Sequence, residues 1–119
     1  MSRLMSVAFT EQAVRDRTKT VTRRKGWTFL KPGDTLTLCR KVMGRKAGEP
    51  LVRVAEVQVL EVRREPLRLI SDADVEREGF PGMSRVDFIN KFFVEAQGIY
   101  PHEVVTRIEW RYLDAKATP

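Results

Sequence analysis

Hydrophobic and polar residues alternate with a period of two along several stretches of this chain, which is the pattern of half-buried β-strands. The valine-rich segment 51–64 shows it most strongly, and segments 35–40 and 104–113 show it as well. Two short apolar segments, 4–9 and 67–70, predict further strands. Predicted strands therefore outnumber predicted helices.

The alternation within segment 51–64 changes phase at Ala55 and Glu56, so the valines on the two sides of this pair belong to different faces. One extra residue in a strand produces such a slip and increases the local twist. The sequence therefore predicts a bulge or bend here, as in a strongly curved sheet or barrel.

Short helices are predicted between these strands. Thr10 is a suitable N-cap for a brief helix, and Ser71 with Asp74 forms a capping-box pattern that Gly79 can close. A further helix starts at Ser84 and carries an apolar stripe at helical spacing, which we assign to the core. The stripe consists of Val86, Phe88, Ile89, Phe92 and Phe93.

These elements predict an α+β fold, a small curved sheet or β-barrel with two or three short helices. A chain of 119 residues suits one domain, which we place at residues 1–113, with a C-terminal tail at 114–119. A hydrophobic content of 42% with 32% charged residues is typical of soluble globular proteins. No apolar run approaches the roughly 18 residues that span a membrane, so we expect a cytoplasmic protein with no membrane partner.

The chain has one cysteine and one histidine, which limits its chemistry. No intramolecular disulfide can form, and Cys39 is interpreted as a small buried strand residue. His102 and Cys39 are too few to build a zinc site, and no carboxylate spacing predicts a magnesium site. We expect neither a metal nor another cofactor.

Positive charge is concentrated in one part of the sequence. Residues 15–46 hold eleven Lys or Arg against Asp16 and Asp34, a net charge of +9, whereas the rest of the chain has eleven basic and fourteen acidic residues. Such a segregated basic segment indicates a phosphate-bearing partner.

Within it, residues 19–27 combine four cations, two threonines and a tryptophan. The two arginines suit bidentate phosphate contacts, although a solvated basic face is the alternative. The tryptophan could stack on a base or anchor its loop in the core. The residues assigned to nucleic-acid binding are Arg23, Arg24, Lys25, Trp27 and Lys46.

The order of motifs resembles that of the ASCH domain, over nearly the whole chain. Lys19-Thr20-Val21-Thr22-Arg23-Arg24 comes first, Lys31-Pro32-Gly33-Asp34 precedes a strand, and the long valine strand is followed by an acidic helix that ends in Glu78-Gly79-Phe80, before a closing strand. The resemblance implies a barrel akin to the PUA domains of RNA-modifying enzymes, with a cleft lined by the basic loop.

Small bacterial members of that family resemble amidohydrolases that remove the acetyl group from N4-acetylcytidine with a lysine, a threonine and a glutamate. The matching positions here are Lys19, Thr22 and Glu78. The implied partner is RNA or a modified nucleoside. This chain differs in a longer basic loop around residues 44–48 and in Trp27, and both differences leave the substrate open.

The chemistry expected of these three residues has a physical basis. A threonine hydroxyl is a poor nucleophile and needs a base, which Lys19 can supply if burial or neighbouring cations lower its pKa. Glu78 could orient the amine or act on water, but pairing with it favours the charged lysine. In a regular strand Lys19 and Thr22 would face opposite sides, so their cooperation requires a bend.

Other interpretations remain open. Lys19 could be a solvated rim cation, Thr22 a plain strand residue and Glu78 part of a polar helix surface. The function would then be that of an RNA-binding module without chemistry. A ribonuclease is a third hypothesis, for which a single distant histidine makes the usual acid–base pair awkward.

Overall fold

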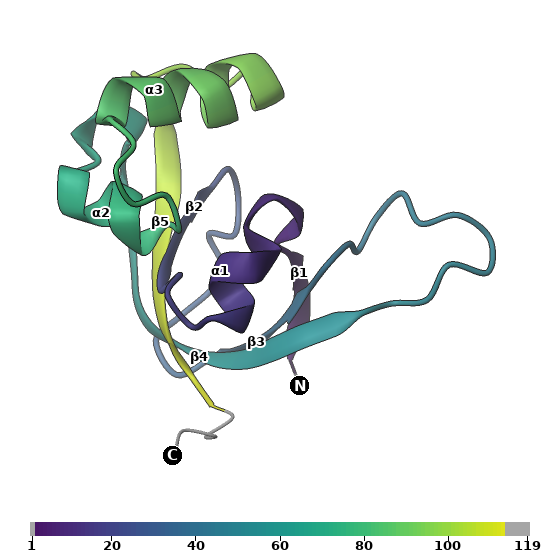
Figure 1. Ribbon diagram of the computed structural model, residues 1–119. Coiled ribbons are helices and arrows are strands. Elements are labelled where there is room, and N and C mark those ends of the chain that lie inside the picture. The colour runs from purple at the N-terminus through teal and green to yellow at the C-terminus, as the bar shows by residue number, and fades with distance from the viewer. Residues whose placement is uncertain (1, 114–119) are drawn as a thin grey trace.

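The strands form one five-stranded sheet in the order β1-β3-β4-β5-β2 (Figure 1). The computed structural model describes residues 2–113, so the expected tail at 114–119 lies outside the described residues. β1 pairs with β3 in parallel, and the other neighbours are antiparallel. The strands are β1 Arg3–Ser6, β2 Val21–Arg24, β3 Thr35–Cys39, β4 Arg53–Pro66 and β5 Val104–Tyr112.

The sheet curls into a half-barrel, as the sequence predicted. The Arg24 guanidinium on one edge strand donates a hydrogen bond to the Ser6 carbonyl on the other, with Nη2 and O 2.6 Å apart. The curl therefore brings β1 and β2 close together, although they are the first and last strands of the sheet.

Two irregularities bend the long strand β4. Leu38 pairs with Ala55 while Cys39 pairs with Arg53, and a second shift lies between Val59 and Glu61 in the pairing with β5. The first shift falls directly before Ala55 and confirms the predicted bulge to within a residue. The second was not predicted from the valine pattern.

Short helices surround this sheet: η1 Ala8–Thr10, α1 Glu11–Arg15, α2 Asp72–Arg77, α3 Arg85–Ile89 and the π-helical η3 Asn90–Glu95. The Ser71 and Ser84 hydroxyls accept hydrogen bonds from the Asp74 and Asp87 amides, which confirms the predicted Ser71 cap and the predicted helix start at Ser84. Thr10 precedes α1, but its side chain makes no capping hydrogen bond.

The strand predicted at 67–70 is wrong, because Leu67–Leu69 forms the 3₁₀ turn η2. Leu67 and Ile70 are both buried, and a 3₁₀ turn places residues three apart on one side. The Ile70 amide donates to the Leu67 carbonyl, which closes the turn. Burial of this apolar segment therefore comes from a turn rather than from strand pairing.

Two apolar clusters form the core. One fills the half-barrel around Leu36, Leu38 and Trp110, and α1 contributes Val14 to it. The other lies under α2, α3 and η3 and contains Phe88, Ile89 and Phe93, as predicted for the helical stripe. Val86 of that stripe is exposed instead. Figure 1 shows α2 and α3 gathered at one end of β5, with α1 on the concave side of the curl.

Strand β5 is buried on both faces in its central part, which the alternating pattern did not predict. Val105 and Arg107 are buried as well as Thr106 and Ile108. The second face is covered because Arg107 binds Asp74 of α2. The alternating sequence of β5 predicts one buried face, whereas the helices cover part of the second face as well.

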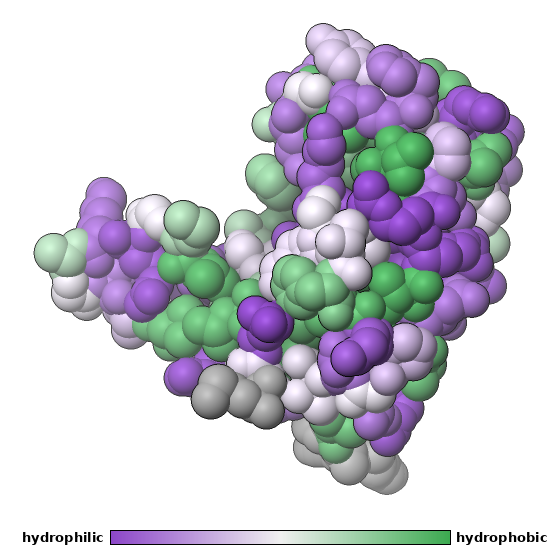
Figure 2. All heavy atoms as spheres, turned by 180° about the vertical axis from the view of Figure 1, so that it is seen from behind, coloured by the Kyte–Doolittle hydropathy of each residue, from purple (hydrophilic) through white to green (hydrophobic). Residues whose placement is uncertain are grey.

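Residues 40–52 connect β3 to β4 as an arm that projects from the body (Figure 1). Hydrophilic and apolar side chains both appear on this arm when the molecule is viewed from behind (Figure 2). Cys39, directly before the arm, is buried as predicted. Among residues 2–113, no helix is long and apolar enough to cross a membrane.

Candidate functional site

A pocket of about 180 Å³ lies where the two edge strands meet the helical end of the molecule. One part of its wall is polar and comes from β2, the segment before it and the end of α2: Lys19, Thr22, Arg23, Arg24 and Glu78. Another part is aromatic and comes from η1, the segment after α2, α3 and η3: Phe9, Phe80, Phe88, Phe92 and Phe93. The structure thus brings all three predicted catalytic residues to one pocket.

Lys19 is only 3% exposed, so it is not a solvated rim cation. Its ammonium donates a hydrogen bond to the Glu78 main-chain carbonyl, with Nζ and O 2.8 Å apart, and lies 3.5 Å from the Glu78 carboxylate Oε1. Burial lowers the pKa of Lys19 to about 8, with the Glu78 charge opposing this and the Arg24 charge adding to it. Lys19 therefore titrates close to neutral pH.

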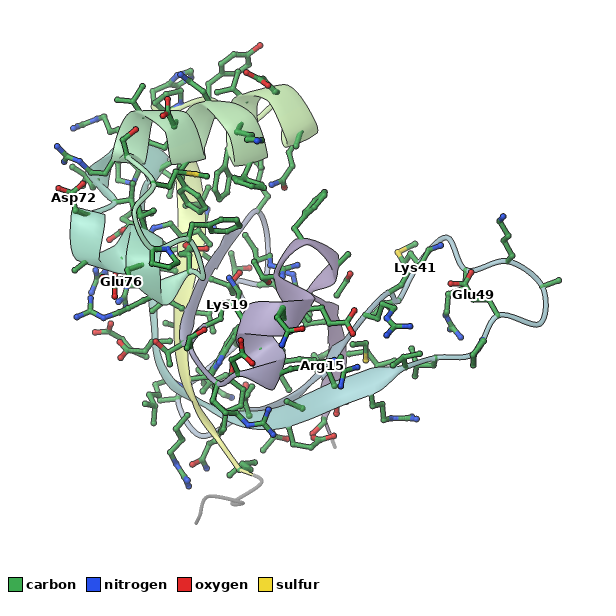
Figure 3. All side chains as sticks on the ribbon, in the orientation of Figure 1. Arg15, Lys19, Lys41, Glu49, Asp72 and Glu76 are labelled. Atoms are coloured by element: carbon green, nitrogen blue, oxygen red, sulfur yellow. The ribbon has the colours of Figure 1, made fainter. Side chains whose placement is uncertain are left out.

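The backbone on either side of Lys19 explains how it reaches the pocket. Lys19 precedes β2, so strand alternation does not fix its direction relative to Thr22. The Thr20 amide donates to the Arg77 carbonyl, and the Trp110 indole donates to the Lys19 carbonyl. These bonds tie the segment to α2 on one side and to β5 on the other. In Figure 3, Lys19 lies between α1 and α2.

Glu78 is 3% exposed and caps the C-terminus of α2, so it is not a solvated surface acid. Gly79 follows with φ of 110°, which confirms the predicted helix end. A Cβ atom on Gly79 would lie 3.0 Å from the Ala13 Cβ, so glycine permits close contact of α1 with the end of α2. Figure 3 shows Glu76 and Asp72 on the outer side of α2, away from Lys19.

Thr22 and Arg24 are linked to each other within the pocket wall. The Arg24 Nε donates to the Thr22 hydroxyl at 3.2 Å. Within the described chain, no hydrogen bond joins Lys19 to Thr22 and no carboxylate forms an ion pair with Arg24. Burial lowers the pKa of Arg24, and the Glu78 charge opposes this. A half-buried guanidinium held by neutral acceptors is well suited to an anionic or partly anionic group of a ligand.

Arg23 has a different position from the phosphate contact predicted for it. Its guanidinium is buried and donates to Glu78, Asp74 and Glu65 at 3.0, 2.6 and 2.8 Å. Asp74 is bound by Arg107 as well, 2.7 Å away. These contacts fix the second oxygen of Glu78, and they leave Arg23 engaged with carboxylates rather than free for phosphate.

Burial alone would raise the pKa of Asp74, but hydrogen bonds from Arg107, Arg23 and Arg77 hold it well below its usual range. The Arg23 Nε is buried without a hydrogen-bond partner. The ion cluster around Asp74 is therefore a charged layer behind the pocket that connects α2 to β2 and β5.

The other predicted nucleic-acid-binding residues lie outside this pocket. Lys25 is exposed and pairs with Glu103 at 2.7 Å, and Lys46 is exposed on the arm. Trp27 is half-buried, packs against the half-barrel core and lies against Phe29 with ring centroids 5.5 Å apart. These contacts agree with the interpretation that Trp27 anchors its loop in the core, and base stacking by Trp27 stays a prediction.

Sequence reasoning missed the aromatic wall, because it assigned the phenylalanine stripe entirely to the core. Phe92 is half-buried, and Phe9 is 74% exposed. A signal existed in Phe9, a phenylalanine at the end of an apolar segment directly before a helix cap. Across residues 2–113, no group of three or more His, Cys, Asp or Glu side chains is placed to hold a metal ion.

No protein-family model and no curated protein sequence matches this chain. Crystal structures similar to it include the following two. A protein of Enterococcus faecalis described as DUF984 shares 14% identity at a TM-score of 0.69, covering 95% of this chain and 77% of that one. An ASCH domain from Lactobacillus crispatus shares 10% identity at a TM-score of 0.60, covering 93% and 79%. With a curled half-barrel and short helices in the same arrangement, this chain has an ASCH-like fold.

Proposed function

We propose that this protein is an amidohydrolase that removes the acyl group from the N4 atom of an acylated cytidine. One observation carries the proposal: Lys19, Thr22 and Glu78 line the same pocket, with Lys19 buried and its pKa lowered to about 8. A base poised near the working pH is what activation of a threonine hydroxyl requires.

The proposed reaction has two steps. Thr22 Oγ1 attacks the amide carbonyl carbon while Lys19 takes up the hydroxyl proton, and the bond to N4 breaks as that proton passes to the leaving amine. Water then cleaves the acyl ester, which frees the carboxylic acid and restores Thr22. Because Lys19 and Thr22 share no direct hydrogen bond, the first proton moves through a water molecule or after a side-chain rotation.

Glu78 and Arg24 have supporting roles in this scheme. The Glu78 carboxylate holds the Lys19 ammonium at 3.5 Å and stabilises the charge that forms on it. The Arg24 guanidinium, bonded to the Thr22 hydroxyl, lies beside the nucleophile and can stabilise the oxyanion of the tetrahedral intermediate.

A second candidate function is RNA binding without chemistry. It is favoured by the exposed cations on the arm, where Arg45 and Lys46 lie together and have no carboxylate partner for their side chains within the described chain. A ribonuclease has less support, because His102 is not among the residues that line the pocket.

The test is incubation of the purified protein with N4-acetylcytidine without added metal, followed by chromatography. The proposal predicts release of cytidine and acetate in equal amounts. Unchanged N4-acetylcytidine at high protein concentration, together with tight binding of RNA, would favour the binding module instead.

A further inference from the structure

Phe9 stands out among the exposed apolar side chains because of where it lies. Isolated exposed apolar residues are common on protein surfaces. Of the large apolar side chains exposed in the described part of the chain, however, Phe9 is the one that lines the pocket of Lys19 and Glu78. It is 74% exposed, so the fold gains little from this ring.

In contact with Phe9, Phe92 belongs to the π-helical segment η3 and is half-buried. Its ring lies 4.4 Å from that of Phe80 and 6.1 Å from that of Phe9, centroid to centroid. The Phe9 and Phe92 planes are inclined at 63°, so they meet edge to face rather than stack. Phe92 thus packs against the Phe80 ring as well, whereas within residues 2–113 the Phe9 ring contacts no aromatic ring other than that of Phe92.

The π-helical turn accounts for this arrangement. In an α-helix, residues four apart share a face, which would pair Phe88 with Phe92 and turn Phe93 aside. In η3 both Phe92 and Phe93 contact Phe88, with centroids 5.7 and 5.5 Å away. The wider turn therefore adds one more ring to the pocket wall, and π-helical turns often occur at functional sites.

We propose that Phe9 and Phe92 form an aromatic wall at the mouth of this pocket, against which a single unpaired nucleobase packs. A cavity of about 180 Å³ is suited to one ring with a short substituent, since a cavity of about 150 Å³ accepts benzene. The polar part of the pocket wall supplies the donors of Lys19 and Arg24, which match the carbonyl oxygens of a pyrimidine. This aromatic wall selects for a free nucleoside or an unpaired nucleotide, because a base within a duplex has both faces stacked.

This inference rests on the proposed function only in placing the ligand in that pocket. Measurements of cytidine binding test it without requiring catalytic turnover. Equilibrium dialysis of cytidine against wild type, Phe9→Ala, Phe9→Leu and Phe9→Tyr separates stacking on an aromatic ring from contact with any apolar side chain. Loss of one stacking partner weakens base binding by about 5- to 150-fold. That loss is expected for Phe9→Ala and for Phe9→Leu, which keeps apolar bulk without a ring. Phe9→Tyr should bind within about 3-fold of wild type.

Phe29→Ala is the matched control, since Phe29 is also an exposed phenylalanine, 51% exposed, but does not line this pocket. It should leave cytidine affinity unchanged, and ribose should not bind to any variant.

If wild type hydrolyses N4-acetylcytidine, Phe9→Ala should raise KM with kcat nearly constant. If wild type binds cytidine but hydrolyses nothing, the proposed function fails and the dialysis series still decides whether the aromatic wall binds the base. The inference is overturned if wild type and Phe9→Ala bind cytidine equally well. It is also overturned if Phe9→Leu keeps full affinity, or if wild type does not bind cytidine.

Discussion

The Lys19 ammonium and the Glu78 carboxylate lie 3.5 Å apart, and both side chains are almost completely buried. Glu78 holds Lys19 a second time, because its main-chain carbonyl accepts a hydrogen bond from the same ammonium. Burying charges has a cost that a protein fold recovers only with good geometry. In the proposed function this pair is the basis of a catalytic site.

The activity should depend on pH through Lys19. The base must be neutral to accept the Thr22 proton, and its pKa is about 8. The value of kcat/KM for N4-acetylcytidine is therefore expected to rise about tenfold per pH unit below 8 and to level off above it. A profile that is flat from pH 6 to 9 would show that Lys19 is not the base.

The same group should make stability depend on pH in a defined direction. The pKa of Lys19 is about 8 when folded against 10.5 ordinarily, so between these pH values the unfolded chain binds more protons. Stability should then rise with pH in that window, by about 3 kcal/mol for this group. We expect wild type to gain this amount over Lys19→Ala between pH 8 and 10.5 in urea unfolding. An equal pH response in both proteins would contradict the buried, shifted lysine.

Arg23 should matter for folding rather than for RNA affinity. Arg23→Ala leaves Asp74, Glu65 and Glu78 without a shared cation, and breaking a buried ion pair costs about 3–5 kcal/mol. Lys25→Ala removes an exposed ion pair with Glu103 and should cost less than about 1 kcal/mol. Urea unfolding of both variants checks this. Comparable losses in the two would mean that the Asp74 cluster is not a stabilising unit.

The arm should give any RNA binding its salt dependence. Replacing Arg45 and Lys46 together by Ala is expected to flatten the log–log salt slope by about 0.7 for each lost phosphate contact. Arg68→Ala with Lys91→Ala removes the same charge from two exposed positions outside the arm and should leave the slope unchanged. Equal slopes for wild type and the arm variant would show that the arm is a solvated surface.

The sequence predicted the parts of this fold that depend on local pattern. The serine caps, Gly79 and the bend in β4 all follow from short-range rules on capping, positive φ and phase slips. The turn at Leu67 was missed, because a short buried apolar segment has no period that separates a strand from a turn.

The contents of the pocket were less accessible from sequence. Lys19, Thr22 and Glu78 came from the resemblance, and the structure places them in one pocket. Arg23 was assigned to phosphate on its bidentate geometry, and its carboxylate partners could not be foreseen because they lie 42 to 55 positions away in the sequence. Phe9 and Phe92 meet only after the half-barrel and the helices assemble, so their pairing is a tertiary property with no local signal.

The most direct test of the proposed amidohydrolase function compares cytidine release from N4-acetylcytidine by wild type, Thr22→Ser and Thr22→Val. Serine keeps a hydroxyl nucleophile, whereas valine keeps the shape and removes only the hydroxyl. With Thr22 as the nucleophile, we expect turnover by wild type, measurable turnover by Thr22→Ser and a loss of at least about 100-fold in kcat for Thr22→Val. Circular dichroism verifies that each protein is folded. Full activity of folded Thr22→Val, or no release of cytidine by wild type at any pH between 6 and 10, would contradict it.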